Sequence, residues 1–362
     1  MRPSSSSPRN RARAFCRDYG LRIPILVAPM AGACPPALSA AVIRAGGMGA
    51  CGALVLDAER IAAWMDAVRR DIDGPVQMNL WIPEPAPERD ESAEASQRAF
   101  LARFGPEPAA ETGDFRLLDF DDQVEALIAA RPTVASSIMG LFPPRVVKRL
   151  HGAGIRWWAT ATTVGEALAA AQAGADAIVA QGMEAGGHRG AFDSATAERD
   201  LVGLFALVPA IADAVDLPVI AAGAVADGRA VAAALTLGAS AVEVGTGFLR
   251  APETAVAAPW ADAISNASPE GTMITRALTG RPARALATRF VRAAAEPGAP
   301  PPAPYPVQRG ITAPMKTAAG RERDVERMQA WAGQGASRAV AAPAGEIATR
   351  LWQDAEARLS SP

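Results

Sequence analysis

The residues best suited to chemistry lie in the segment AQGMEAGGHRG, residues 180–190, which follows a short apolar run typical of a strand. This segment carries His188, one of only two histidines in 362 residues, directly after two glycines. An imidazole at this place could accept a proton near neutral pH, or as a cation could bind an anionic substrate. Its position at a strand end favours a role in chemistry over that of a packed core histidine.

The other candidate groups give little chemistry. His151 precedes Gly152 in the last turn of an expected helix, where a partly cationic ring would complement the helix dipole. Cys16, Cys34 and Cys51 have no metal-ligand spacing, and neither histidine has a partner at HExxH spacing, so we expect no metal site. No GxSxG or P-loop motif occurs. A cofactor would therefore have to supply much of the chemistry.

Strands and helices alternate along the chain, which predicts an α/β fold with a parallel sheet. Eight units favour a closed (β/α)8 TIM barrel over an open doubly wound sheet, whose glycine-rich signature should open the first unit, where this chain reads APMAGA. The expected strands cover residues 25–30, 47–53, 76–82, 133–140, 155–162, 177–182, 218–224 and 241–248.

The barrel is expected to be one of several parts. Residues 1–22 are expected to form a flexible N-terminal tail, and residues 23–251 the barrel, with a polar, Pro-rich insertion at about 83–120 over its mouth. Residues 252–292 are expected to form a small substrate-binding cap beside the barrel. Residues 293–362 then supply a Pro-rich loop and C-terminal helices that pack back on the barrel.

Composition excludes several function classes. The net charge of -2 leaves no basic excess for nucleic acid or anionic lipid. The N-terminal segment lacks the apolar core of a signal peptide, and no apolar run reaches the roughly 18 residues of a membrane span. These features predict a cytoplasmic protein that acts on a small molecule, either as a monomer or as a homodimer.

Reactive groups of such barrels lie at the C-terminal ends of the strands. The loops after the seventh and eighth strands, AAGAVADG and VGTGF, offer small side chains and the hydroxyl of Thr246. They suit a phosphate held by backbone N–H groups. The same glycines could instead only turn the chain, and these residues alone leave both interpretations open.

Five segments stand out in order along the chain: PILVAPMAGACPPALSAAVIRAGGMGACG (24–52), QMNLW (77–81), AQGMEAGGHRGAF (180–192), PVIAAGAVADGRAVAAALTLGASAVEVGTGFL (218–249) and TGRPARALATRF (279–290). Together they resemble the signature segments of the nitronate monooxygenases, formerly called 2-nitropropane dioxygenases. The resemblance implies an FMN-containing TIM barrel with a smaller substrate-binding domain. It further implies oxidation of alkyl nitronates, and of nitroalkanes, by O2 to a carbonyl compound and nitrite, through a flavin semiquinone and without a reduced nicotinamide.

The resemblance also implies roles for individual residues. His188 would bind the nitronate anion or remove a proton from the neutral nitroalkane, and Tyr305 would lie near the substrate. Most of the other matched residues would bind FMN. Ala28, Pro29 and Met30 would line the ring, Asn79 and Gln181 would hydrogen-bond it, Gly186 and Gly187 would approach the ring or ribityl chain, and Gly223, Ala224, Glu243, Val244, Gly245 and Thr246 would hold the phosphate, mostly through backbone.

Two residues depart from the family pattern. Ala224 stands where a second glycine is usual, so a positive φ or a close phosphate would cost about 1 kcal/mol there. Thr288 stands where an asparagine is common. Both departures bear on FMN affinity more than on the type of reaction.

Two other functions remain open. NAD(P)H-dependent FMN reductases of the enoyl-acyl-carrier-protein or quinone reductase type are similar over the same barrel and the same GGH turn. Such an enzyme would use the same FMN and histidine but take hydride from a nicotinamide. The third interpretation is a barrel that binds a phosphorylated metabolite without redox chemistry, and it predicts a colourless protein.

Overall fold

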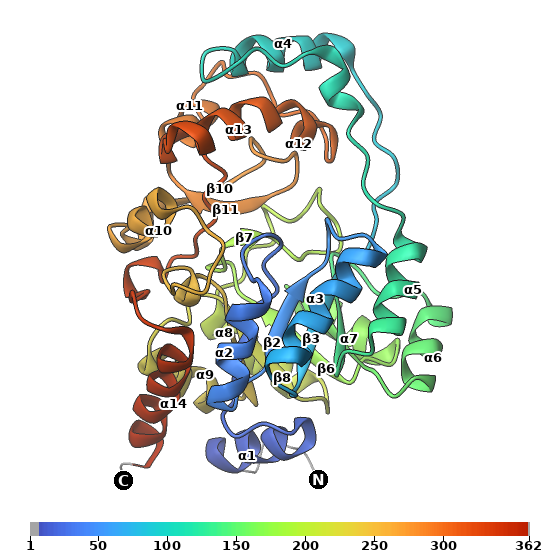
Figure 1. Cartoon of the computed structure of the whole chain (residues 1–362), viewed down its shortest axis with the longest axis vertical. Coiled ribbons are helices and arrows are strands. Elements are labelled where there is room, and N and C mark those ends of the chain that lie inside the picture. The colour runs from blue at the N-terminus through green and yellow to red at the C-terminus, as the bar shows by residue number, and fades with distance from the viewer. Residues whose placement is uncertain (1–6, 361–362) are drawn as a thin grey trace.

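The computed structural model describes residues 7–360 as an eight-stranded barrel with a smaller cap above it (Figure 1). The sheet has the order β1-β9-β8-β6-β5-β4-β3-β2 with every neighbouring pair parallel, and a bridge between Leu26 and Met48 joins its two ends. The predicted TIM barrel is confirmed, and each strand lies within an expected range. The strands are β1 (Ile25–Val27), β2 (Gly49–Gly52), β3 (Val76–Trp81), β4 (Val134–Ile138), β5 (Arg156–Ala161), β6 (Ala177–Gln181), β8 (Val219–Ala222) and β9 (Ala241–Val244).

Helices surround the sheet, and their ends follow local sequence signals. At α7 the side chain of Thr163 accepts a hydrogen bond from the N–H of Glu166, and at α9 Asp227 accepts from Ala230, which satisfies N–H groups that a helix leaves free. The last helix, α14, packs against α9 and α2. The helices around the barrel are α2 (Pro36–Ala45), α3 (Ala58–Asp71), α5 (Phe120–Ala130), α6 (Pro144–Gly152), α7 (Val164–Gln172), α8 (Leu204–Ala214), α9 (Gly228–Thr236) and α14 (Ala344–Ser360).

Two adjacent tryptophans show how the core divides. Trp157 and Trp158 point to opposite sides of β5 and are both fully buried. Trp157 packs between sheet and helices near Phe142, whereas Trp158 lies inside the barrel with Leu26. The alternation of side chains along a strand explains this division, and it confirms the packing role expected for both rings.

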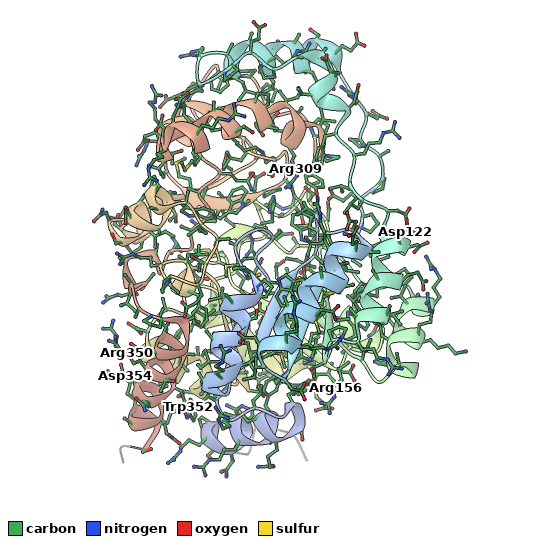
Figure 2. The ribbon with its side chains drawn as sticks, viewed as in Figure 1. Asp122, Arg156, Arg309, Arg350, Trp352 and Asp354 are labelled. Carbon is green, nitrogen blue, oxygen red and sulfur yellow. The ribbon has the colours of Figure 1, made fainter. Side chains whose placement is uncertain are left out.

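Helix α1 (Pro8–Tyr19) lies across the bottom of the barrel (Figure 1). Phe15 and Tyr19 are buried, with ring centroids 5.8 and 5.0 Å from that of Trp158, and the indole N–H of Trp158 donates to the Tyr19 hydroxyl at 2.8 Å. Arg156 lies over the Tyr19 ring at 4.3 Å, beside α1 in Figure 2. The expectation of a flexible tail over residues 1–22 is therefore wrong for this helix, because its aromatic face finds a site inside the barrel. Residues 1–6 lie outside the described residues.

The cap draws on more of the chain than residues 252–292. Helix α4 from the insertion and helices from residues 289–322 share one apolar core, which includes Phe100, Phe290 and Met315. Residues 293–362 were expected to pack on the barrel, but the part of them up to residue 322 belongs to the cap. The cap elements are α4 (Glu91–Leu101), α10 (Ala258–Ser265), β10 (Thr272–Thr275), β11 (Ala283–Leu286), α11 (Arg289–Ala294), α12 (Val307–Ile311) and α13 (Ala313–Glu322).

The cap and the barrel are joined by a second, three-stranded sheet. Strand β7 (Gly187–His188) leaves the barrel after β6 and pairs antiparallel with β11, which pairs with β10. The GGH turn is thus held between the two parts of the molecule. Over the described part of the chain, no helix is long and apolar enough to cross a membrane.

Candidate active site

The C-terminal ends of the barrel strands open into a cavity of about 340 Å³ that the cap partly covers. This volume is within the range of small-molecule sites, roughly 300–1,000 Å³. The cavity brings together thirteen of the fifteen residues that the sequence singled out. They are Ala28, Pro29, Met30, Asn79, Gln181, Gly186, Gly187, His188, Gly223, Ala224, Glu243, Gly245 and Thr246.

The two other residues lie away from the cavity wall. Val244 points into the core between sheet and helices, because it follows Glu243 on a strand and side chains alternate. Tyr305 does not line the cavity but packs against Trp81, which does, with the two ring centroids 5.8 Å apart. Its hydroxyl is buried without a hydrogen-bond partner, and burial raises the pKa of Tyr305 to about 12.

His188 is fixed at the junction of barrel and cap. Its Nε2 lies 2.9 Å from the hydroxyl oxygen of Thr279. That hydroxyl can donate to the carbonyl of Arg281 at 3.3 Å, so its oxygen is free to accept the proton on Nε2. In this arrangement Nδ1 keeps its lone pair, and no hydrogen bond to it is made within the described residues.

The surroundings of His188 keep its ring neutral. Desolvation lowers the pKa of His188 well below 6.5, and the positive charges of Arg281 and Arg309 lower it further, together with that of Lys316 in its protonated form. Burial lowers the pKa of Lys316 itself to about 7, so its charge is only partly present at neutral pH. Trp81 and Trp331 pack edge-on against the imidazole, with centroids 4.7 and 5.0 Å away. The site therefore presents a neutral base in a positive field, an arrangement that suits an anionic substrate.

Gln181 and Asn79 have their amides oriented by the protein. The Oε1 of Gln181 accepts from the N–H of Gly190 at 2.8 Å and from Arg189 at 3.1 Å, while Nε2 donates to the carbonyl of His188 at 3.1 Å. Only the second proton on Nε2 remains for a ligand. Asn79 uses Nδ2 on the carbonyl and hydroxyl of Ser136, which leaves Oδ1 as an acceptor.

Another part of the cavity wall is formed by small residues. Gly223 has a φ of 134° and Ala224 a φ of 50°, so Ala224 does adopt the left-handed conformation that favours glycine. Gly186 has no room for a side chain, because an added Cβ would lie 2.5 Å from the nitrogen of Gly333. That nitrogen donates to the hydroxyl oxygen of Thr246 at 3.0 Å, at the start of the 3-10 turn η3 (Thr246–Phe248).

The floor of the cavity is polar and includes Glu243. Its Oε1 accepts from Gln77 Nε2 at 2.9 Å, and burial raises the pKa of Glu243 to about 7. The Oε1 of Gln77 is buried and has no hydrogen-bond partner among residues 7–360. Thr288, the second departure from the family pattern, lies elsewhere, since it caps α11 within the cap.

Several cavity residues were not predicted from the sequence. Trp81 could have been, because it ends β3 within the segment QMNLW. Barrel residues such as Gln77, Ile138 and Thr160 were also missed, although they lie on the predicted strands. A further group comes from the cap and the segment after α13, where no strand end marks them; Figure 2 shows Arg309 on the cap side, above the barrel. These residues are Trp260, Arg309, Gln329, Trp331, Gly333 and Gly335.

Fold and cavity together define a barrel enzyme with a small-molecule site at the C-terminal ends of its strands. A sequence profile described as nitronate monooxygenase matches residues 17–354. The chain is 38% identical over 345 residues to a nitronate monooxygenase of Pseudomonas aeruginosa, covering 94% of this chain and 98% of the relative. It is 37% identical to a nitronate monooxygenase of Paraburkholderia phytofirmans, covering 94% of each chain. The chain therefore belongs to the nitronate monooxygenase family, as its signature segments predicted.

Solved structures agree with this family. A nitroalkane oxidase from Streptomyces ansochromogenes superposes with a TM-score of 0.84 at 35% identity, covering 96% of this chain and 99% of the other. FabK from Thermotoga maritima superposes with a TM-score of 0.73 at 27% identity, covering 96% of each chain. The fold of this chain is thus similar to that of two differently named proteins, a nitroalkane oxidase and FabK.

Proposed function

We propose that this protein uses FMN to oxidise alkyl nitronates, and neutral nitroalkanes that lose a proton, with O2 to a carbonyl compound and nitrite. Membership of the nitronate monooxygenase family gives the reaction. The observation that carries the proposal is His188, a neutral imidazole in a positive field at a cavity rimmed by the family's strand-end residues. We further propose a cytoplasmic monomer or homodimer.

The cavity fits FMN. Gly186 lines the cavity with its backbone alone, because the space on its Cβ side is filled by Ala332 and Gly333, and a backbone surface of this kind suits a planar ring. The oriented amides of Gln181 and Asn79 offer one donor and one acceptor to the ring's own polar edge. The small residues near Gly223 and Gly245 leave backbone open to a phosphate. When bound, the flavin would supply the electron-accepting group that the chain's own side chains lack.

His188 would act on the substrate in two ways. A nitronate is already an anion, and the charge of Arg309 and that of Lys316 in its protonated form favour its entry next to the neutral ring, whereas Arg281 is paired with Glu84. A neutral nitroalkane must first lose its α proton, and Nδ1 is the nitrogen left to take it. Thr279 would hold the tautomer in which Nδ1 is free.

The aromatic side chains around the substrate region would limit water. Trp81, Trp260 and Trp331 line the cavity, and the indole N–H of Trp260 is used on the carbonyl of Trp331 at 3.0 Å. The N–H of Trp260 is therefore not available to a ligand, and the carbon faces of the three rings do not solvate a nitronate, so its charge would be stabilised mainly by His188 and the nearby cations. This arrangement favours an alkyl chain packed against the tryptophans.

A second candidate is an NAD(P)H-dependent FMN reductase, the alternative that the barrel and the GGH turn of the sequence leave open. An anaerobic titration separates the two functions. Purified protein loaded with FMN is mixed with a nitronate in one cuvette and with NADH or NADPH in others, and the flavin absorbance is followed. We expect the nitronate to change the flavin spectrum and the nicotinamides to bleach it slowly or not at all. Rapid bleaching by a nicotinamide would instead make the protein a reductase.

A further inference from the structure

Glu243 lies at the floor of the cavity; its backbone was expected near the FMN phosphate, but its side chain has no role in the function proposed above. It projects from β9 and is 8% exposed. Among the residues that line the cavity it is the one acidic side chain. The two other ionisable residues of the lining, His188 and Arg309, lie on the side of the cap.

The protein gives this carboxyl one neutral partner. Oε1 accepts from Gln77 Nε2 at 2.9 Å, and the same nitrogen also donates to Ser136 Oγ at 3.0 Å. Within residues 7–360, no Lys, Arg or His lies at ion-pair distance from Glu243. A carboxylate that loses most of its water and gains one shared amide hydrogen bond is poorly stabilised, which favours its neutral acid form.

The second oxygen of Glu243 faces the cavity. Oε2 makes no hydrogen bond within the described part of the chain, and it is not among the buried polar atoms that the protein encloses without a partner. It is therefore open to a ligand. A protonated Oε2 can donate a hydrogen bond, whereas an ionised one can only accept.

Building on the FMN-dependent function proposed above, we propose that Glu243 binds the flavin as a neutral carboxylic acid, donating a hydrogen bond from Oε2 to an acceptor atom of the ring. When ionised, the group loses this donor and places a negative charge beside an electron-rich ring. Flavin affinity then falls as pH rises through the titration of Glu243. By linkage, bound flavin makes the same carboxyl harder to ionise.

Other ionisable groups near Glu243 titrate in different ranges. Burial raises the pKa of the Cys34 and Cys51 thiols, and His188 stays neutral because its pKa is well below 6.5. The remaining neighbours in the barrel do not ionise. In the cap, burial lowers the pKa of Lys316 to about 7, but this residue does not line the cavity, and riboflavin carries no charge that the loss of its proton would affect strongly. The phosphate of FMN titrates near pH 6, and its second charge should strengthen binding as pH rises. Riboflavin lacks the phosphate and therefore isolates the contribution of Glu243.

The test is a pH series of flavin affinities. Quenching of flavin fluorescence gives the Kd of riboflavin and of FMN between about pH 6 and about pH 9 for the wild-type chain and for Glu243→Gln, which cannot ionise. The control is Glu94→Gln, a glutamate whose side chain is 2% exposed but which is paired with Arg89 in the cap. Gln77→Met is a second variant, since it removes the one amide donor to the carboxylate. Circular dichroism checks that each variant is folded.

We expect the wild-type Kd for riboflavin to rise by up to tenfold per pH unit above about pH 7, and that of Glu94→Gln to rise equally. Glu243→Gln should change less than about twofold over the series. Gln77→Met should move the fall in affinity to higher pH. The proposal is overturned if Glu243→Gln keeps the wild-type pH dependence, or if the wild-type Kd does not change. If the wild-type chain bound no flavin at any pH, the proposed function would be overturned as well. That result differs from flavin binding that does not depend on pH, which would overturn only the role of Glu243.

Discussion

Replacement of Ala224 by glycine should stabilise the protein. Ala224 has a φ of 50°, where an L-residue pays about 1–2 kcal/mol because its Cβ crowds the following carbonyl. Glycine avoids this cost but loses about 0.4–1 kcal/mol, because it has more freedom in the unfolded chain. The balance predicts that Ala224→Gly gains about 0.5–1 kcal/mol in free energy of unfolding.

The loop cannot easily relax around Ala224 to remove the strain. Gly335 packs directly on it, so closely that a Cβ on Gly335 would lie 2.8 Å from the Ala224 carbonyl oxygen. Through this contact, a shift of the Ala224 backbone would also move the segment around Gly333, whose N–H donates to Thr246. Relief of strain at Ala224 should therefore appear in global stability and not only in local mobility.

Chemical unfolding of the protein without flavin measures the effect, with Ala226→Gly as the matched control. Ala226 lies in the same loop and also lines the cavity, but its φ is not positive. Its replacement should cost about 0.5–1 kcal/mol through the unfolded chain alone. The two variants should thus change stability in opposite directions. If Ala224→Gly loses as much stability as Ala226→Gly, the assignment of strain to Ala224 is wrong.

Three further predictions concern other residues of the site. His188→Asn should keep FMN bound but lose most activity on neutral nitroalkanes and less on preformed nitronates; kcat/KM for both substrates measures this, and full activity on the nitroalkane would end the base role. Glu243→Gln should stabilise the flavin-free protein at high pH. Burial raises the pKa of Glu243 from 4.5 to about 7. The stability it contributes is complete below pH 4.5 and is lost as pH rises through about 7, a loss of about 3 kcal/mol. Equal pH–stability curves for wild type and variant would contradict this. Gly186→Ala should weaken FMN binding at least about tenfold, because the new Cβ meets the Gly333 nitrogen at 2.5 Å; Gly152→Ala, which meets nothing within 4 Å, is the control, and equal Kd values would refute the argument.

The barrel could be predicted because its signals are local. Most strands are short, largely apolar runs bounded by turn residues, and several helices begin at a capping side chain such as that of Thr163 or Asp227. The site at the strand ends follows from the barrel itself, since parallel strands deliver their C-terminal ends to one face. The family resemblance then gave roles to residues whose spacing alone left alternatives open.

The N-terminal helix could not be predicted in the same way. The segment around Phe15 and Tyr19 has a low mean hydropathy because it contains several arginines. The two aromatic residues on one face therefore give no clear apolar pattern in the sequence. That face is stable only because the barrel presents Trp158 at its open lower end. The partner of the helix is thus about 140 residues away, a distance over which composition and periodicity carry no signal.

The cap shows the same limit, and it matters more because the cap completes the site. Arg309, Gln329 and Trp331 reach the cavity from segments with no strand end and no motif. Their positions depend on a core that joins Phe100 of the insertion to Phe290 and Met315. Under the function proposed above, the barrel residues would hold the flavin ring, and the cap residues would lie beside the substrate. Substrate choice in this protein should accordingly change with substitutions in the cap, while flavin binding should follow the strand ends.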